Sequence, residues 1–135
     1  MEVKMEKWVR ILYIEDNDQN FYLVNFILGS KGYEVIRARD GEEGIELAST
    51  IGPNMILLDI QLPVMDGYTT AKELRRVPKL SGTPIIALTS YAMTGDREKA
   101  MAAGCTGYIE KPINPKIFAD QIKDYMGSSV PGEEC

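Results

Sequence analysis

Short apolar runs that each lead to a chemically reactive side chain constrain the fold of this chain more than any other feature. The runs are Ile11–Ile14 before Glu15 and Asp16, Met55–Leu58 before Asp59, Ile85–Leu88 before Thr89, and Tyr108-Ile109 shortly before Lys111. The carboxyl ends of strands in a parallel α/β sheet meet at one edge, and ligands bind there. We therefore expect an acid pair, a further acid, a hydroxyl and an amine to converge at one edge of a sheet.

Strand-like and helix-like patterns alternate along the whole chain, as they do in βαβ units around a parallel sheet. Strands are predicted at 9–14, 34–38, 55–59, 85–89 and 107–109, and helices at 17–30, 40–52, 68–77, 94–104 and from 114 onward. This order predicts an α/β fold, a doubly wound (βα)5 three-layer sandwich with the flavodoxin-like parallel strand order 2-1-3-4-5.

Capping signals place several helix ends. Asp40 is expected to cap the second helix, with Glu43 completing a capping box, and Gly52 ends that helix. Thr94 is expected to cap the fourth helix and Asn114 the fifth. The side chains expected to face inward are Leu23, Val24, Ile27 and Leu28 in the first helix, and Ile117, Phe118, Ile122 and Tyr125 in the fifth.

Length and charge narrow the class of protein. The 135 residues suffice for one domain, predicted at 9–126, with an N-terminal extension at 1–8 and a flexible tail or linker stub at 127–135. The net charge of −5 argues against a nucleic-acid or anionic membrane surface, and the basic group Lys72, Arg75, Arg76 and Lys79 is expected to be a solvated helix face. No apolar run approaches a membrane span and the start lacks a signal peptide, so a cytoplasmic location is expected.

Residue types that are missing exclude further chemistry. The chain has no histidine, which rules out histidine metal ligation and histidine acid–base catalysis, so a phosphohistidine would have to come from another protein. The two cysteines have no metal-ligand spacing, and Cys105 is expected to be a small buried residue.

The converging carboxylates predict a cation site. Two unit charges 4 Å apart repel by about 4 kcal/mol at an effective dielectric constant near 20. Lys111 offsets one of the three negative charges of Glu15, Asp16 and Asp59, and the remaining two match a divalent cation. Oxygen ligands without histidine or thiolate favour Mg²⁺ or Mn²⁺ over zinc.

A carboxylate beside Mg²⁺ and an amine can attack phosphorus and become an aspartyl phosphate. Phosphoryl transfer requires positioning and neutralisation of charge more than covalent chemistry from the protein. The hydroxyl of Thr89 can donate to a phosphoryl oxygen, and the small Ser90 beside it lets the backbone approach closely.

Four motifs together resemble the receiver domain of two-component response regulators. They are Tyr13–Asn17 (YIEDN), Leu58–Gly67 (LDIQLPVMDG), Leu88–Ser90 (LTS) and Lys111-Pro112 (KP). The resemblance covers about residues 9–126. The stretch Thr89–Asp96 is most similar to stand-alone receivers and to the receivers of hybrid sensor kinases.

The resemblance implies a role for each site residue. Asp59 would be the phosphoacceptor, and Asp16, Asp59 and the backbone carbonyl of Gln61 would bind Mg²⁺, with Glu15 assisting through water. Many receivers have two aspartates where this chain has Glu15 and Asp16, which makes direct metal ligation by Glu15 the less expected arrangement. Lys111 would pair with the phosphoryl group, and its peptide bond to Pro112 is expected to be cis.

The resemblance also implies a switch. Thr89 would move toward the phosphate and Tyr108 would turn inward behind it, which would remodel the partner-binding face of the fourth helix, fifth strand and fifth helix. Gln61 and Tyr91 would tune the lifetime of the phosphate. The expected partners are a sensor histidine kinase or a histidine phosphotransfer protein and a downstream protein target, with the chain a monomer or a dimer formed on phosphorylation.

Four functions compete at this point. A signalling switch would accept a phosphoryl group from a phosphohistidine protein onto Asp59 and hydrolyse it slowly, and would not be a metabolic enzyme. A Mg²⁺-dependent phosphatase typically has a second Asp two residues after the nucleophile, where this chain has Gln61. A flavin carrier needs a Ser/Thr-rich phosphate loop after the first strand, where Glu15–Asp18 would repel a phosphate. A receiver that binds partners without any phosphate is the fourth.

Overall fold

Five parallel strands form a single sheet in the predicted order β2-β1-β3-β4-β5. The computed structural model describes residues 9–62, 64–90 and 95–127. The strands are β1 Val9–Ile14, β2 Tyr33–Ala38, β3 Met55–Asp59, β4 Ile85–Thr89 and β5 Gly107–Glu110. The helices are α1 Asp18–Gly29, α2 Gly41–Ile51, α3 Gly67–Arg75, α4 Asp96–Ala102 and α5 Phe118–Gly127, with a short 3₁₀ turn η1 at Pro78–Leu80.

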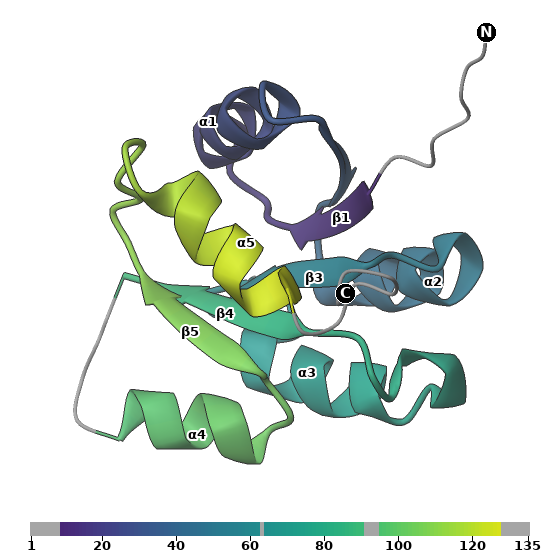
Figure 1. Ribbon diagram of the computed structural model, residues 1–135. Helices are drawn as coiled ribbons and strands as arrows, with labels where there is room; N and C mark the ends of the chain where they lie inside the picture. The colour runs from purple at the N-terminus through teal and green to yellow at the C-terminus, as the bar shows by residue number, and fades with distance from the viewer. Residues whose placement is uncertain (1–8, 63, 91–94, 128–135) are drawn as a thin grey trace, which may run out of the picture.

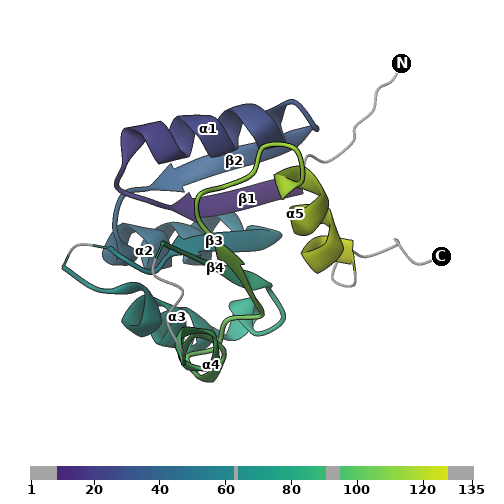
Figure 2. The same ribbon diagram turned by 90° about the vertical axis from the view of Figure 1, so that its left-hand side faces the viewer.

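The sheet separates two hydrophobic cores because successive strand side chains point to opposite faces. In β1, Ile11 and Tyr13 pack with α1 and α5, whereas Leu12 and Ile14 pack with α2, α3 and α4. Figures 1 and 2 show α1 and α5 on one side of the sheet and the other three helices on the opposite side. Burial on both faces explains why the strands appear in the sequence as continuous apolar runs.

The predicted ends of α2 are confirmed, apart from one detail of its cap. Asp40 Oδ1 accepts a hydrogen bond of 2.9 Å from the Glu43 N–H, and Gly52 ends the helix with a φ of 62°. The Glu43 carboxylate accepts from the Arg39 N–H at 2.8 Å, whereas a capping box would use the N–H of Asp40. The side chain therefore satisfies a donor one residue before the predicted one.

The predicted start of α5 was wrong, whereas α4 begins at Asp96, within the start predicted at residues 94–96. Asn114 opens a turn in which its Oδ1 accepts from the Lys116 N–H at 3.0 Å, and α5 begins only at Phe118. Residue Gly95, with a φ of 92°, is the N-cap of α4 and offers no side-chain capping bond. Thr94, the predicted cap, lies outside the described residues.

Two of the side chains expected to face inward are exposed. Leu23 is 38% exposed and Ile117 46% exposed, whereas their neighbours Val24 and Phe118 are fully buried. Leu23 lies at the edge of the apolar stripe of α1, and Ile117 lies in the turn that precedes α5. Leu23 lines the pocket described below.

Three remaining expectations have different outcomes. Cys105 is buried and is a free thiol, as predicted. Arg75 is not the solvated side chain that was expected, because it donates to the carbonyl oxygens of Gly104 and Leu80, each at 2.8 Å. Among the helices of the described ranges, none has the length and apolar character needed to cross a membrane.

Candidate functional site

Three carboxylates meet at the carboxyl ends of β1 and β3. Glu15, Asp16 and Asp59 each offer an oxygen, and these oxygens lie within 4.8 Å of one another. Asp59 is the last residue of β3, and Glu15 and Asp16 directly follow β1. Glu15 and Asp59 are buried and Asp16 is exposed, so the cluster opens to solvent on one side.

Lys111 reaches this cluster from the end of β5. Its Nζ donates to Glu15 Oε1 at 3.3 Å and lies 3.5 Å from Asp59 Oδ1. The peptide bond from Lys111 to Pro112 is cis, as expected. One amine thus contacts two buried carboxylates that come from different strands.

The surroundings of Asp59 disfavour its charge. Burial, together with the negative charge of Glu15, raises the pKa of Asp59 to about 6. Lys111 and the backbone N–H of Gln61, which donates to Asp59 Oδ1 at 3.0 Å, lower the pKa but do not offset the increase. The site therefore holds a carboxylate that gains from any added positive charge.

Glu15 is held by groups that sequence reasoning did not identify. The hydroxyl of Tyr13 donates to Glu15 Oε1 at 2.7 Å, and the backbone N–H of Asn17 donates to Oε2 at 3.2 Å. Burial and the Glu15 carboxylate raise the pKa of Tyr13, so the phenol keeps its proton as a donor. The alternation of strand side chains could have indicated this contact, since residues two apart share a face.

Gln61 connects the loop after β3 with the end of β4. Its Nε2 donates to Thr89 Oγ1 at 3.0 Å, and its Oε1 accepts from the Ser90 N–H at 3.4 Å. The loop returns to β3 at Gly67, whose N–H donates to the Ile60 carbonyl at 3.0 Å. A Cβ at Gly67 would lie 2.5 Å from the Cα of Ile60, so this close approach requires glycine.

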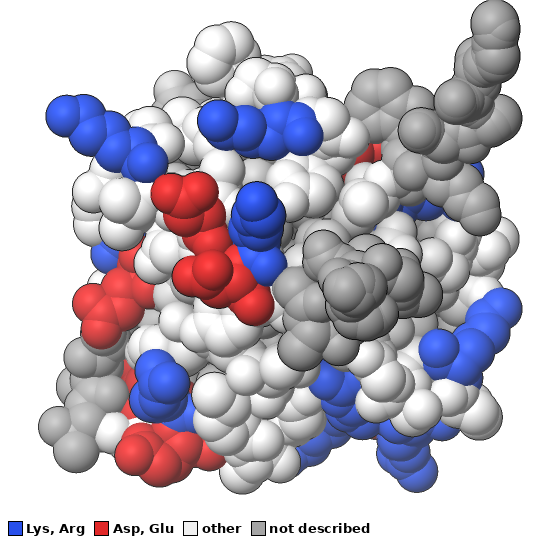
Figure 3. All heavy atoms as spheres, in the orientation of Figure 1, with Lys and Arg blue, Asp and Glu red and all other residues white. Residues whose placement is uncertain are grey.

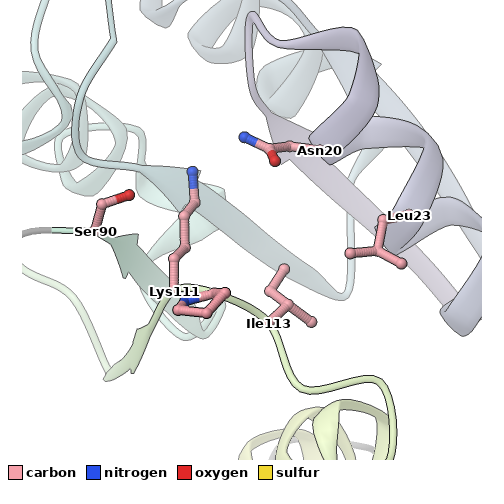
Figure 4. A pocket seen from close by; sticks show the side chains of 6 residues that line it. Asn20, Leu23, Ser90, Lys111 and Ile113 are labelled. Atoms are coloured by element: carbon pink, nitrogen blue, oxygen red, sulfur yellow. The ribbon is translucent and has the colours of Figure 1, made fainter.

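A pocket of about 370 Å³ lies beside Lys111 (Figure 4). It is lined by Asn20, Leu23, Ser90, Lys111, Pro112 and Ile113, which come from α1, the end of β4 and the segment after β5. The amine of Lys111 extends into the space between Ser90 and Asn20. The amine is therefore accessible from this pocket.

One predicted residue, Tyr108, is not part of this cluster. Tyr108 on β5 packs against the core on the α2, α3 and α4 side, and the Arg97 guanidinium lies 5.9 Å from its ring. Burial raises the pKa of Tyr108. Tyr91 lies outside the described residues.

The donor set at the cluster fits a hard divalent cation. It consists of the carboxylate oxygens of three residues, and the Lys111 amine offsets one of their negative charges. On the molecular face in Figure 3, acidic and basic side chains are interspersed among uncharged ones.

Comparison with known proteins gives one consistent result. Residues 11–123 match the family described as response regulator receiver domain. The polar-differentiation response regulator DivK of Brucella anthropi is 40% identical over 119 residues, which cover 88% of this chain and 97% of DivK.

Solved structures agree with this match. One similar structure is the receiver domain of the sensor histidine kinase PA1611 from Pseudomonas aeruginosa, which has a magnesium ion coordinated in its active-site cleft. It is 35% identical to this chain with a TM-score of 0.82, and the similarity covers 90% of this chain and 99% of that domain. The co-crystal structure of the Saccharomyces cerevisiae phosphotransfer protein Ypd1 and the receiver domain of Ssk1 gives a TM-score of 0.82 and 26% identity, covering 96% and 97% of the two chains.

Proposed function

The chain belongs to the response regulator receiver domain family of two-component signalling, and on that premise we propose that Asp59 accepts a phosphoryl group and acts as the input of a switch. It is a signalling protein and not a metabolic enzyme. The observation that carries the proposal is the convergence of Glu15, Asp16 and Asp59 within 4.8 Å, with the Lys111 amine 3.5 Å from Asp59.

In the proposed step, a carboxylate oxygen of Asp59 attacks the phosphorus of the donor. The new P–O bond replaces the P–N bond of a phosphohistidine, whose imidazole leaves, and the product is an acyl phosphate. Lys111 stabilises the charge on the phosphoryl oxygens, and the Thr89 hydroxyl donates to one of them after it leaves Gln61. The backbone N–H of Ser90 can approach the same group, because Ser90 lies at the mouth of the pocket.

The acidic site resembles the Mg²⁺ site of the family, and a related receiver has magnesium in its active-site cleft. For this chain, Asp16, Asp59 and the Gln61 carbonyl would hold Mg²⁺ or Mn²⁺, and Glu15 would act through water. Tyr13, Lys111 and the Asn17 N–H already bond to Glu15, which favours an indirect role. When bound, the ion supplies positive charge to the transferring phosphoryl oxygens.

The output is proposed to be a change of surface. Thr89 moves toward the phosphate, Tyr108 turns inward, and the face of α4, β5 and α5 changes for a downstream protein or for dimer formation. The half-burial of Tyr108 at the edge of the core supports this role, because such a ring can occupy two positions. Gln61 and Tyr91 are the positions proposed to set the lifetime of the phosphate.

The proposed donor is a sensor histidine kinase or a histidine phosphotransfer protein, the class to which Ypd1 belongs. Such a donor has to cover the pocket beside Lys111 while its imidazole reaches Asp59. Three apolar side chains line this pocket, Leu23 from α1 and Pro112 and Ile113 after β5. Two further exposed aromatic side chains of α1, Tyr22 and Phe26, lie one helical turn apart. These side chains would give a partner helix an apolar contact area.

The test is the intact mass of the protein after incubation with Mg²⁺ and acetyl phosphate. The wild type should gain one phosphoryl group, and Asp59→Asn and a chelator control should gain none. Asp66→Asn is a matched control, because Asp66 lies nearby in the same loop as an exposed N-cap and asparagine preserves that cap.

A phosphoryl group that persists in Asp59→Asn would place the acceptor elsewhere. If the wild type gains no mass, a titration with beryllofluoride, which mimics the phosphoryl group, separates a short-lived phosphate from a binding module that does not use phosphate. The absence of beryllofluoride binding would contradict the proposal, as would a phosphoryl group that persists in Asp59→Asn.

A further inference from the structure

We propose that Arg37 is a positioning residue that holds the loop carrying Glu15 and Asp16 in its metal-binding conformation. This inference rests on the proposed metal-binding function of that loop. Arg37 lies on β2, where it is the register partner of Tyr13 in β1. Its side chain is only 12% exposed, although β2 is an edge strand of the sheet.

The guanidinium bonds to the loop at two points. Its Nε donates to the Glu15 carbonyl oxygen at 3.1 Å, and its Nη1 donates to Asp18 Oδ1 at 2.8 Å. Asp16 and Asn17 lie between these two points in the sequence. The rigid fork of an arginine can fix both ends of such a short segment at once, which a lysine cannot do.

An aromatic ring fixes the guanidinium in this place. Its carbon lies 5.0 Å from the ring centroid of Phe21, and Phe21 in turn stacks on Tyr13 at 6.2 Å. Tyr13 donates to the Glu15 carboxylate, so Arg37 and Tyr13 hold the backbone and the side chain of Glu15 respectively. The loop is thereby attached to both β1 and β2.

One atom of Arg37 indicates that the contact is not there for stability alone. Nη2 is buried and has no hydrogen-bond partner in the described part of the chain. Leaving a buried donor without a partner costs about 1–3 kcal/mol. An uncharged apolar residue on β2 would avoid that cost but would leave the loop unattached, so the geometry points to a function for the loop contacts.

The positioning role and the charge of Arg37 make opposite predictions for cation binding. A positive charge close to the site repels Mg²⁺, so its removal alone would increase the affinity. Loss of the loop contacts would decrease the affinity, since outer contacts that orient ligands are typically worth about 10–100-fold. The direction of the change therefore identifies which effect dominates.

Arg39 is the matched control. Its Nη1 lies 3.3 Å from the same Asp18 oxygen, but its side chain is 62% exposed. Arg39→Gln removes one positive charge and one ion pair with Asp18, as Arg37→Gln does, and leaves the bond to the Glu15 carbonyl in place.

The experiment compares the wild type with Arg37→Gln, Arg37→Lys and Arg39→Gln. Calorimetric titration with Mg²⁺ should show affinity about 10-fold weaker in both Arg37 variants and changed by less than about 2-fold in Arg39→Gln. Hydrogen exchange of the metal-free protein should be faster at residues 15–18 in the Arg37 variants only. Thermal unfolding with a chelator reports any general loss of stability.

Three results would overturn the proposal: an unchanged Mg²⁺ affinity in Arg37→Gln with a lowered melting temperature, a higher affinity in Arg37→Gln, or a full rescue by Arg37→Lys. If the wild type binds no Mg²⁺, the proposed function fails. The exchange rates then still decide whether Arg37 holds the loop, because that measurement needs no metal.

Discussion

Asp59 is the residue at which folding and function conflict most directly. The side chain is buried beside Glu15, and its charged form is disfavoured, as the increase of its pKa to about 6 shows. In the unfolded chain the pKa would be near 3.8. The folded protein therefore binds more protons than the unfolded chain between these two pH values, and its stability falls as the pH rises through about 6.

This linkage predicts how Asp59→Asn behaves without metal. We expect the variant to become more stable than the wild type as the pH rises through 6, with a difference at pH 7.5 of up to about 3 kcal/mol, since one pKa unit corresponds to about 1.4 kcal/mol. Below about pH 4 this contribution should vanish. Thermal unfolding in a chelating buffer across pH 4–8 checks it, and a constant difference across that range would contradict the assigned cause.

Val64 has a strained backbone conformation. It has a φ of 67° and is 99% exposed, so a β-branched residue adopts a left-handed conformation without any packing that compensates. That conformation costs an ordinary residue about 1–2 kcal/mol. We expect Val64→Asn to be more stable by about 1 kcal/mol in chemical unfolding, because asparagine tolerates this region. Val64→Ile, which has the same backbone problem, should not change the stability, and an equal gain in both variants would point away from the backbone.

At the scale of the elements, the strands and four of the helix starts were predicted to within one or two residues, and the start of α5 was not. A strand buried on both faces leaves a continuous apolar run, which the sequence displays directly. The start of α5 depends instead on how Asn114 uses its side chain, and Asn114 closes a turn with Lys116 before the helix begins. Phe118, the first residue of α5, is fully buried in the core, and its N–H donates to the Asn114 carbonyl at 2.9 Å.

The functional site likewise has features that the sequence predicted and contacts that it did not. The chemistry at each strand end was predictable, because Glu15, Asp16, Asp59 and Lys111 stand at the ends of recognisable runs. The contacts of Arg37 were not, since they require the register of β2 against β1 and the placement of Phe21 above the sheet. The strand register and the position of Phe21 depend on packing between elements, and a sequence pattern does not record that packing.

The bond from Gln61 to Thr89 joins the ends of β3 and β4 in the unphosphorylated protein. Thr89 accepts in this bond, so its hydroxyl proton is not used by Gln61, but the proposed movement of Thr89 toward a phosphoryl group would break the bond. A typical hydrogen bond contributes about 0.5–1.5 kcal/mol net. Gln61→Ala should therefore bind beryllofluoride about 3–10-fold more tightly in the presence of Mg²⁺, as measured by calorimetric titration. Gln61→Met, which retains bulk without the amide, should show the same gain. A gain in Gln61→Ala alone would indicate a steric effect.

At the scale of the whole molecule, the site joins parts of the chain that are far apart in sequence. The Lys111 amine and the Glu15 carboxylate are separated by 96 positions, and the loops after β1, β3 and β5 all contribute. A ligand that requires all three loops binds only the folded domain. Its binding energy is therefore added to the global stability and not to that of one segment.

Saturating Mg²⁺ should consequently raise the melting temperature of the entire domain. At 100 times its dissociation constant the expected stabilisation is about 2.7 kcal/mol, which corresponds to several degrees for a domain of this size. Protons compete for Asp59, so the increase should shrink as the pH falls below about 6.

Asp16→Asn and Asp59→Asn should lose most of this stabilisation, and Asp66→Asn, whose carboxylate caps α3 outside the cluster, should retain it. Scanning calorimetry with and without Mg²⁺ measures the effect. If Asp59→Asn is stabilised as much as the wild type, the cation binds elsewhere on this acidic chain and the cluster is not its site. If the increase is as large at pH 4.5, below the pKa of Asp59 in the metal-free protein, as at pH 7.5, the Asp59 carboxylate is not one of the ligands.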